Sequence, residues 1–235
     1  MNKEEFIEEL KKISIIPTSH QLEQLDIYYK LLRNWNEKIN LTAIVEESQV
    51  YLKHFYDSLT LNKVISLNEI HTLCDIGTGA GFPGIVIKIF FPNISVTLVD
   101  SLQKRVNFLQ EVIKQLHLKD IVVFHARAEE YAKNNREKYE VVTARAVANL
   151  SLLSEYCLPL VKTNCYFLPM KADISQEIFE VGNAISILGG KLEETFEFYL
   201  PKEESKRTIL KIKKITPTNK KYPRKYNEMK KNPLK

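Results

Sequence analysis

Apolar residues recur at helical intervals through the first 60 residues or so of this chain. A helix is predicted to begin after Thr18, because Gln21 stands at capping-box distance from it and an apolar stripe follows. The stripe consists of Leu22, Leu25, Tyr29, Leu32 and Trp35. A second helical stretch covers about residues 48–61. We therefore expect an N-terminal helical extension over residues 1–61, with the stripe in the core.

From residue 72 the period changes, and short β-branched runs alternate with helical segments. Strands are predicted at 72–76, 95–100, 121–125, 141–145 and 165–171, and helices at 102–116, 148–160 and 174–188. This alternation is typical of an α/β fold with a mostly parallel sheet. Two closing segments, 192–200 and 207–215, have no helix between them. They predict an antiparallel strand pair at the sheet edge, which ends a domain over residues 62–215.

Composition favours an ordinary folded protein without a membrane anchor. The chain has 235 residues, of which 44% are hydrophobic and 27% charged. Its most apolar run, Ile85 to Phe91, contains Lys88 and is far too short to span a bilayer. The three cysteines form no CxxC pair, which suits reduced thiols and gives a metal site little support. We expect a cytoplasmic monomer without membrane association or bound metal.

Positive charge is concentrated at the C-terminal end. Residues 206–235 carry 12 Lys and Arg against Glu228 alone, whereas the upstream part has 22 basic and 28 acidic residues. The net charge of +5 therefore conceals an end segment of +11 and a body of −6. Two tyrosines, Tyr222 and Tyr226, stand among the basic residues. This pattern indicates a polyanion partner, with nucleic acid the leading candidate, and a basic tail over residues 216–235.

A glycine-rich segment follows the first predicted strand and carries the candidate chemistry. The loop Gly77–Gly84 leads from the strand into a helix, as in several nucleotide-binding folds. A dinucleotide-binding loop has glycine at the position of Phe82, and the Gly-Lys-Ser/Thr of a P-loop is missing, so neither motif fits this loop. The Gly-x-Gly-x-Gly spacing resembles motif I of the class I methyltransferases. This resemblance implies a Rossmann-like S-adenosylmethionine-binding domain over residues 62–215, with Gly77 and Gly79 approaching the cofactor.

Acidic residues at the predicted strand ends fit the same ligand. Asp100 ends the second strand, 19 residues after Gly81, where a carboxylate can accept hydrogen bonds from ribose hydroxyls. Ala128 and Glu129 follow the third strand, in the turn where such enzymes hold adenine. Asp75 leaves two interpretations open, because it could order the loop or contact the ligand.

Several ordered motifs resemble the bacterial 16S ribosomal RNA guanine-N7 methyltransferases, formerly called glucose-inhibited division protein B. They are residues 35–42, 54–59, 75–84 and 99–101, Lys104-Arg105, Ala128-Glu129, Arg145-Ala146-Val147 and residues 221–224. The resemblance spans nearly the whole chain, and it implies cofactor contacts at Gly77, Phe82, Ala128, Glu129 and Arg145. The implied substrate is 16S ribosomal RNA or the small ribosomal subunit. The chain departs from the family at Asn227 and Met229, where a Gly-x-Pro step is usual.

Guanine N7 carries a lone pair and no hydrogen, so the reaction needs alignment more than a catalytic base. Arg145 is the candidate for alignment, with a structural ion pair as the other interpretation. Substrate contacts are expected from His54, Lys221, Arg224 and Lys225, although His54 could merely stabilise the helical extension. Truncation after Lys214 should then spare cofactor affinity. Two other functions stay open: a non-catalytic RNA-binding protein on this fold, and a methyltransferase for a protein or small molecule.

Overall fold

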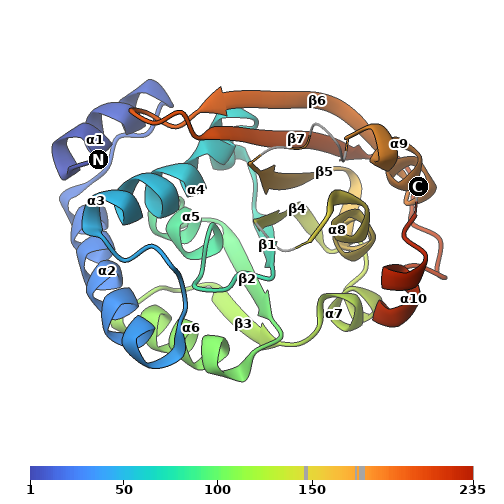
Figure 1. Ribbon diagram of the computed structural model, residues 1–235, viewed down its shortest axis with the longest axis horizontal. Helices are drawn as coiled ribbons and strands as arrows, with labels where there is room; N and C mark the ends of the chain where they lie inside the picture. Colours follow the sequence, from blue (N-terminus) through green and yellow to red (C-terminus); the bar gives the residue numbers. More distant parts are fainter. Residues whose placement is uncertain (146–147, 173, 175–177, 235) are drawn as a thin grey trace.

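One mixed sheet forms the centre of the molecule, with helices on both faces (Figure 1). The computed structural model describes residues 1–145, 148–172, 174 and 178–234. Its strands are β1 (Thr72–Ile76), β2 (Ser95–Asp100), β3 (Ile121–His125), β4 (Tyr139–Arg145), β5 (Val161–Lys171), β6 (Gly190–Tyr199) and β7 (Lys206–Lys214). Within the described chain their order is β3-β2-β1-β4-β5-β7-β6. The first five strands pair in parallel, and β7 lies antiparallel between β5 and β6.

The order of the strands reverses beside β1, since β2 pairs with one edge of β1 and β4 with the other. Ligands of open α/β sheets bind beyond the carboxyl ends of the strands at such a switch point. The Gly77–Gly84 loop leaves β1 at that position. The topology therefore predicts a ligand site between this loop and the ends of β2 and β4.

Helices and helical turns connect and cover the strands. The N-terminal part contains α1 (Lys3–Lys12), α2 (Ser19–Ile39), α3 (Glu47–Val50), η1 (Tyr51–Tyr56), α4 (Asp57–Leu59), η2 (Thr60–Lys63) and η3 (Leu67–Glu69). The rest are α5 (Gly84–Phe90), α6 (Gln103–Gln115), α7 (Ala128–Asn134), α8 (Leu150–Cys157), η4 (Leu158–Leu160), α9 (Ile178–Ile187) and α10 (Tyr226–Lys231). Among the described residues, no helix is both long enough and apolar enough to cross a membrane.

The two faces of the sheet bury two separate apolar clusters. Side chains of a strand alternate between faces, so Leu73 joins one cluster while Cys74 and Ile76 join the other. The first cluster contains the N-terminal helices together with α5 and α6. The second contains α7, α8 and α9, and also Tyr222 and Met229 of the C-terminal segment. Both ends of the chain are therefore packed against the sheet rather than extended from it.

Most predicted elements are confirmed, and the differences have local causes. The Thr18–Gln21 capping box is present at the start of α2, and the closing antiparallel pair occurs as β6 and β7. The predicted start of β5 at residue 165 is wrong, because the strand begins at Val161. A register shift and the positive φ of Asn164 interrupt this polar stretch, which therefore looks like a turn in the sequence. The helix predicted at 148–160 begins at Leu150, capped by Asn149, and closes as the 3₁₀ turn η4.

The second N-terminal helix is not a regular α-helix. Residues 51–56 form the π-helical segment η1, between the α-helical turns α3 and α4. Its wider turn carries His54, and Asp57 follows at the start of α4. Short π-helical segments occur frequently at functional sites. Here the segment and the start of α4 bring His54 and Asp57 to Arg145 at the end of β4.

Candidate active site

The glycine loop turns through backbone conformations that favour glycine. Gly77, Gly79 and Gly81 have φ values of +67°, +62° and +96°. A side chain at Gly81 would also collide with Tyr28, whose hydroxyl oxygen would lie 2.5 Å from its Cβ. The Tyr28 hydroxyl donates a hydrogen bond to the carbonyl of Ala80. The N-terminal helix α2 therefore holds the loop from outside.

Asp75 orders the loop from within. One carboxylate oxygen, Oδ2, accepts hydrogen bonds from the Thr78 hydroxyl at 2.6 Å and the Gly84 amide at 2.9 Å. The other oxygen, Oδ1, is buried and has no hydrogen-bond partner among the described residues. Burial raises the pKa of Asp75 to about 6. Of the two interpretations left open by the sequence, these contacts favour loop ordering.

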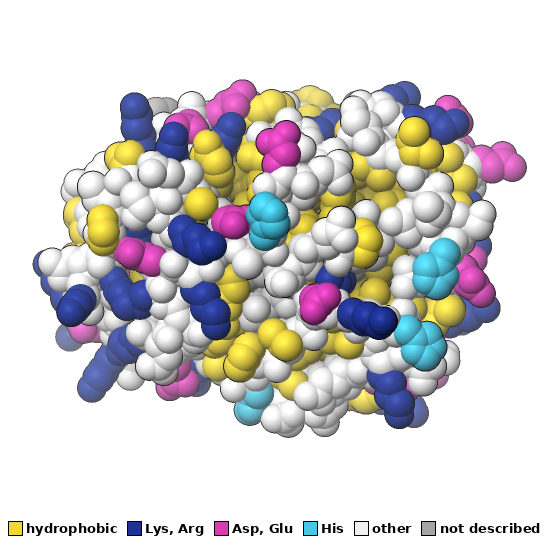
Figure 2. All heavy atoms as spheres, turned by 180° about the vertical axis from the view of Figure 1, so that it is seen from behind, with side chains coloured by type: hydrophobic (Ala, Val, Ile, Leu, Met, Phe, Trp, Pro, Cys, Tyr) yellow, Lys and Arg dark blue, Asp and Glu magenta, His cyan; other side chains and the backbone are white. Residues whose placement is uncertain are grey.

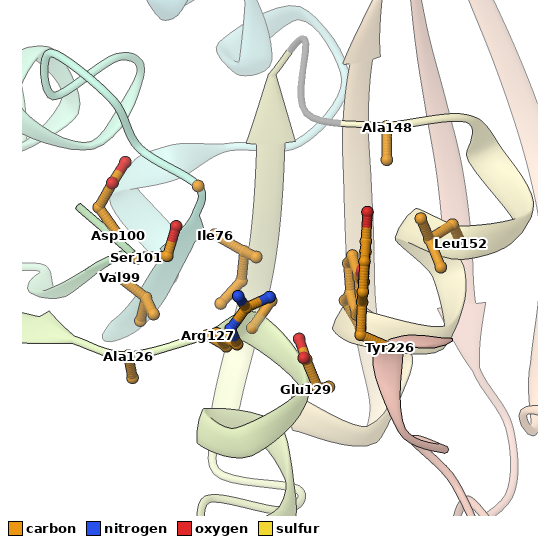
Figure 3. Close-up of a pocket in the computed structure, with 13 residues that line it drawn as sticks. Ile76, Val99, Asp100, Ser101, Ala126, Arg127, Glu129, Ala148, Leu152 and Tyr226 are labelled. Atoms are coloured by element: carbon orange, nitrogen blue, oxygen red, sulfur yellow. The ribbon is translucent and has the colours of Figure 1, made fainter. Parts of the chain in front are cut away.

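A cavity of about 260 Å³ lies between the loop, the ends of β1 and β2, and α7; we call it the loop cavity. It is lined by Ile76, Gly77, Val99, Asp100, Ser101, Ala126, Arg127, Ala128, Glu129, Ala148, Leu152, Tyr156 and Tyr226. Figure 3 shows Asp100 and Ser101 on one side of it, with Leu152 and Tyr226 on the other. Apolar walls with a few polar groups suit a nucleoside. The structure thus brings together four of the predicted cofactor residues: Gly77, Asp100, Ala128 and Glu129.

Asp100 has the geometry of a ribose acceptor. Its carboxylate is 2% exposed and accepts hydrogen bonds from the amides of Gly79 and Leu102, both at 2.9 Å. The Arg105 guanidinium also lies 3.5 Å from Oδ2, and the lone pairs that remain on the two oxygens can accept hydrogen bonds from neighbouring hydroxyls. Through the bond to Gly79, Asp100 also couples the loop to the end of β2.

A second pocket, of about 440 Å³, opens at the carboxyl ends of β4 and β5; we call it the arginine pocket. Its lining includes Lys53, His54, Asp57, Arg145, Met170, Lys171 and Arg207. Arg145 donates to the Lys53 carbonyl at 3.0 Å and to Asp57 at 3.2 Å. Arg207 of β7 donates to both oxygens of the same carboxylate at 3.2 Å. The buried Asp57 therefore holds two guanidinium groups side by side and neutralises only one of their charges.

His54 is a neutral member of this pocket. Burial, followed by the nearby Arg145 charge, lowers the pKa of His54 to about 3. Its Nδ1 lies 3.2 Å from an Arg145 nitrogen and accepts from it, since the guanidinium can only donate. The proton is then on Nε2, which donates to the Thr42 hydroxyl at 2.9 Å. His54 therefore orients Arg145 without carrying charge.

Phe82 of the glycine loop packs against two residues that line this second site, His54 and Arg145. Its ring stacks on His54, with centroids 4.4 Å apart and planes inclined by 14°. The Arg145 guanidinium carbon lies 5.3 Å from the centre of the same ring. Neither Phe82 nor Arg145 lines the loop cavity. The loop that borders the first site therefore also contacts the second, while Ala146 and Val147 of the matched motif lie outside the described residues.

The predicted RNA-contacting residues of the tail lie on another face. Lys221, Arg224 and Lys225 line a groove together with Lys133, Arg136, Lys220, Tyr222, Pro223 and Glu228; we call it the basic groove. Seen from behind, Lys and Arg side chains gather at the lower left of the molecule, over α7 and α10 (Figure 2). Lys221 and Lys225 are exposed, but Arg224 forms a two-pronged pair with the buried Glu155 at 2.9 and 2.7 Å. Arg224 therefore has a structural partner already.

Sequence reasoning missed the contribution of the C-terminal segment to the loop cavity. Tyr226, the first residue of α10, lines that cavity beside Leu152 and Tyr156. The prediction that truncation after Lys214 spares cofactor affinity considered upstream residues alone, and the cavity lining adds Tyr226 to them. The sequence analysis also missed the ion pair of Asp57 and Arg207, because 150 residues separate the two side chains. The tyrosines among the tail lysines were the available signal for this contribution to the loop cavity. The sequence analysis interpreted them only as support for nucleic-acid binding.

The fold matches solved methyltransferase structures at low sequence identity. A structure described as a SAM dependent methyltransferase from Aquifex aeolicus aligns with a TM-score of 0.52 and 19% identity, covering 71% of this chain and 93% of that one. The M. jannaschii protein TYW2 in complex with AdoMet aligns with a TM-score of 0.55 and 15% identity, covering 68% and 77%. These matches show that the chain has the fold of the class I methyltransferases.

Sequence relatives define the family more narrowly. The family described as rRNA small subunit methyltransferase G matches residues 21–209. The Ribosomal RNA small subunit methyltransferase G of Bacillus subtilis (strain 168) is 51% identical, covering 100% of this chain and 99% of that protein. The protein of the same name from Exiguobacterium sibiricum is 47% identical, covering 100% of both. The chain belongs to the rRNA small subunit methyltransferase G family.

Proposed function

We propose that this protein transfers a methyl group from S-adenosylmethionine to N7 of a guanine in small-subunit ribosomal RNA. The observation that carries this proposal is the contact of one loop with two sites. Gly77 borders the loop cavity, while Phe82, five residues later, stacks on His54, which lines the arginine pocket. A donor in the first site and an acceptor base in the second would meet across this loop.

The loop cavity suits the adenosine part of the cofactor. Asp100 would accept from the ribose hydroxyls, and the backbone at Ala128 and Glu129 would border the adenine. When bound, S-adenosylmethionine supplies a methyl group on a positively charged sulfur. Gly79 and Phe82 would then border the path from the loop cavity to the arginine pocket.

The arginine pocket suits the acceptor nucleotide. N7 would attack the methyl carbon with its lone pair, the sulfur–carbon bond would break, and the positive charge would pass to the purine. No proton leaves the attacking atom, so the residues around it need only hold it in line. Arg145 and Arg207 present donors suited to guanine O6 or to a phosphate. His54 and Asp57 position these donors through the bonds described above.

The basic groove would bind the RNA backbone. Its exposed lysines, Lys133, Lys220, Lys221 and Lys225, are suited to phosphate contacts rather than to base recognition. The partner would be 16S ribosomal RNA or the small ribosomal subunit, met in the cytoplasm by a monomer. Arg224 would support the groove through Glu155.

Methylation of ribosomal RNA in cells with and without the protein tests this function. We expect one small-subunit guanine to lose its N7 methyl group in the deletion strain and to regain it with the wild-type gene. Asp100→Ala should fail to restore it, because the ribose contact is lost. A non-catalytic RNA-binding protein would leave the methylation pattern unchanged. Methyl transfer to protein extract but not to RNA would instead support a different substrate.

A further inference from the structure

The C-terminal segment is clamped to the body of the protein by buried polar contacts. Arg136 donates to the carbonyls of Tyr222, at 2.5 Å, and Thr218. The buried Lys214 ammonium donates to the Leu158 carbonyl and to the Thr218 hydroxyl, both at 2.6 Å. These bonds join the segment to the loop that follows α7, to η4 and to β7. Its path over the molecule is therefore determined by the fold.

A second clamp fixes the start of α10. The Arg224 amide donates to Oε1 of Glu155 at 2.8 Å, in addition to the guanidinium pair. Glu155 is 1% exposed and belongs to α8. Met229, on the inner side of α10, is fully buried. The backbone on both sides of Tyr226 is therefore held in place.

This arrangement aims Tyr226 into the loop cavity. Its side chain rises from the start of α10 between Glu129 and Leu152 (Figure 3). The Arg127 guanidinium carbon lies 5.7 Å from the centre of the ring. Tyr226 as a residue is 37% exposed, although it is a large aromatic residue that lines a cavity. An exposed aromatic ring on the wall of a cavity is suited to stacking on a base, here with the Arg127 guanidinium lying over one of its faces.

We propose that Tyr226 packs against the adenosine of the cofactor, and that RNA bound in the basic groove tightens the cofactor site through this residue. The inference rests on the proposed function. Lys225 of the groove is the immediate neighbour of Tyr226, and Lys133 of the groove lies on α7, whose first turn borders the loop cavity. A phosphate held between these lysines steadies both walls. Because such coupling is reciprocal, bound cofactor also strengthens RNA binding.

Calorimetry with S-adenosylhomocysteine on the full-length protein tests whether Tyr226 packs against the adenosine. Tyr226→Ala should weaken binding about 5- to 20-fold, in keeping with the loss of one aromatic stacking contact. Tyr226→Phe should stay within about twofold of wild type, because the ring does the stacking. Tyr199→Ala is the matched control, since this tyrosine of β6 is 63% exposed and does not line the loop cavity. Wild-type affinity in a Tyr226→Ala protein with unchanged thermal stability would overturn the proposal.

The coupling between RNA and the cofactor site is tested by repeating the titration with protein-free small-subunit ribosomal RNA present. RNA should raise the wild-type affinity for S-adenosylhomocysteine at least threefold and leave that of Tyr226→Ala unchanged. An equal rise in both proteins, or none in wild type, would overturn the coupling. Failure of the proposed function has a different signature, because the wild-type protein would then bind no S-adenosylhomocysteine or would methylate no ribosomal RNA.

Discussion

The imidazole of His54 lies flat against the ring of Phe82, with centroids 4.4 Å apart and planes inclined by 14°. One residue comes from the N-terminal π-helical segment and the other from the glycine loop. The N-terminal helices are thus a wall of the arginine pocket as well as a cover for the sheet. Because the imidazole is buried and faces Arg145, its protonation is opposed by the fold.

His54 should make the protein lose stability as the pH falls. The folded pKa is about 3 and the ordinary value is 6.5, so the unfolded chain takes up the proton first. The stability is present above pH 6.5 and is lost as the pH falls toward 3. Between pH 7.5 and 5.5 the wild-type protein should lose about 1.4 kcal/mol more than His54→Gln in urea unfolding. If the difference in unfolding free energy between the two proteins did not change with pH, His54 would not be a buried neutral imidazole.

Asp75 should have the opposite pH dependence. Burial raises its pKa from 3.8 to about 6, so the contribution to stability is present below pH 3.8 and is lost as the pH rises to 6. Between pH 5 and 8 the wild-type protein should lose about 1.4 kcal/mol relative to Asp75→Asn. Asp120→Asn, at an exposed position, serves as the control in the same urea titrations. Parallel curves for wild type and Asp75→Asn would show that Asp75 is ionised throughout.

Asp100→Asn should weaken binding of S-adenosylhomocysteine roughly 10- to 100-fold, as for hydrogen bonds to a charged acceptor. The side-chain NH₂ of the new asparagine would also face the backbone N–H of Gly79 or Leu102, and two donors cannot bond to each other. The loop itself should therefore be disturbed. Calorimetry measures the change, and Glu130→Gln on the exposed side of α7 provides the matched control. Equal affinity in Asp100→Asn and wild type would remove the ribose role.

Arg145→Lys should slow single-turnover methyl transfer roughly 100-fold, since small misplacements of an aligned pair are costly. A lysine cannot reach Asp57, the Lys53 carbonyl and His54 together as the guanidinium does. Arg33→Lys, on the exposed face of α2, should leave the rate unchanged. The alignment mechanism also predicts that neither Asp57→Asn nor His54→Gln abolishes transfer while sparing both ligands. If either variant lost methyl transfer while still binding both ligands, the reaction would involve proton transfer by that residue.

The sequence predicted what depends on neighbours along the chain. β1 and β2 have the predicted bounds because their buried β-branched runs end in the glycine loop and in Asp100. Contacts between distant segments could not be read in this way. Arg224 meets Glu155 across 69 residues, and Arg207 meets Asp57 across 150. The sequence therefore predicted the glycine loop at the end of β1 but not the place of Tyr226, which depends on the pair of Arg224 and Glu155.

The basic groove yields a prediction that avoids damage to the fold. Truncation after Lys214 would remove the buried Thr218, Tyr222 and Met229 together with Tyr226, so it would change stability and the loop cavity at once. Substituting exposed lysines by glutamine separates the effects. The variant should carry Lys133→Gln, Lys221→Gln and Lys225→Gln, all in the groove.

If all three lysines contact phosphates, the plot of log affinity for ribosomal RNA against log salt should become less steep by roughly 2 to 3 units. Each contact is worth a slope of about 0.7 to 0.9, because it releases condensed counterions. A control with Lys30, Lys114 and Lys119 changed to glutamine removes the same charge from exposed positions on and beside α2 and α6. The control should keep the wild-type slope, whereas equal slopes in the groove variant and wild type would show that the groove is only a solvated surface. Thermal unfolding of both variants should match wild type, since none of these lysines is buried.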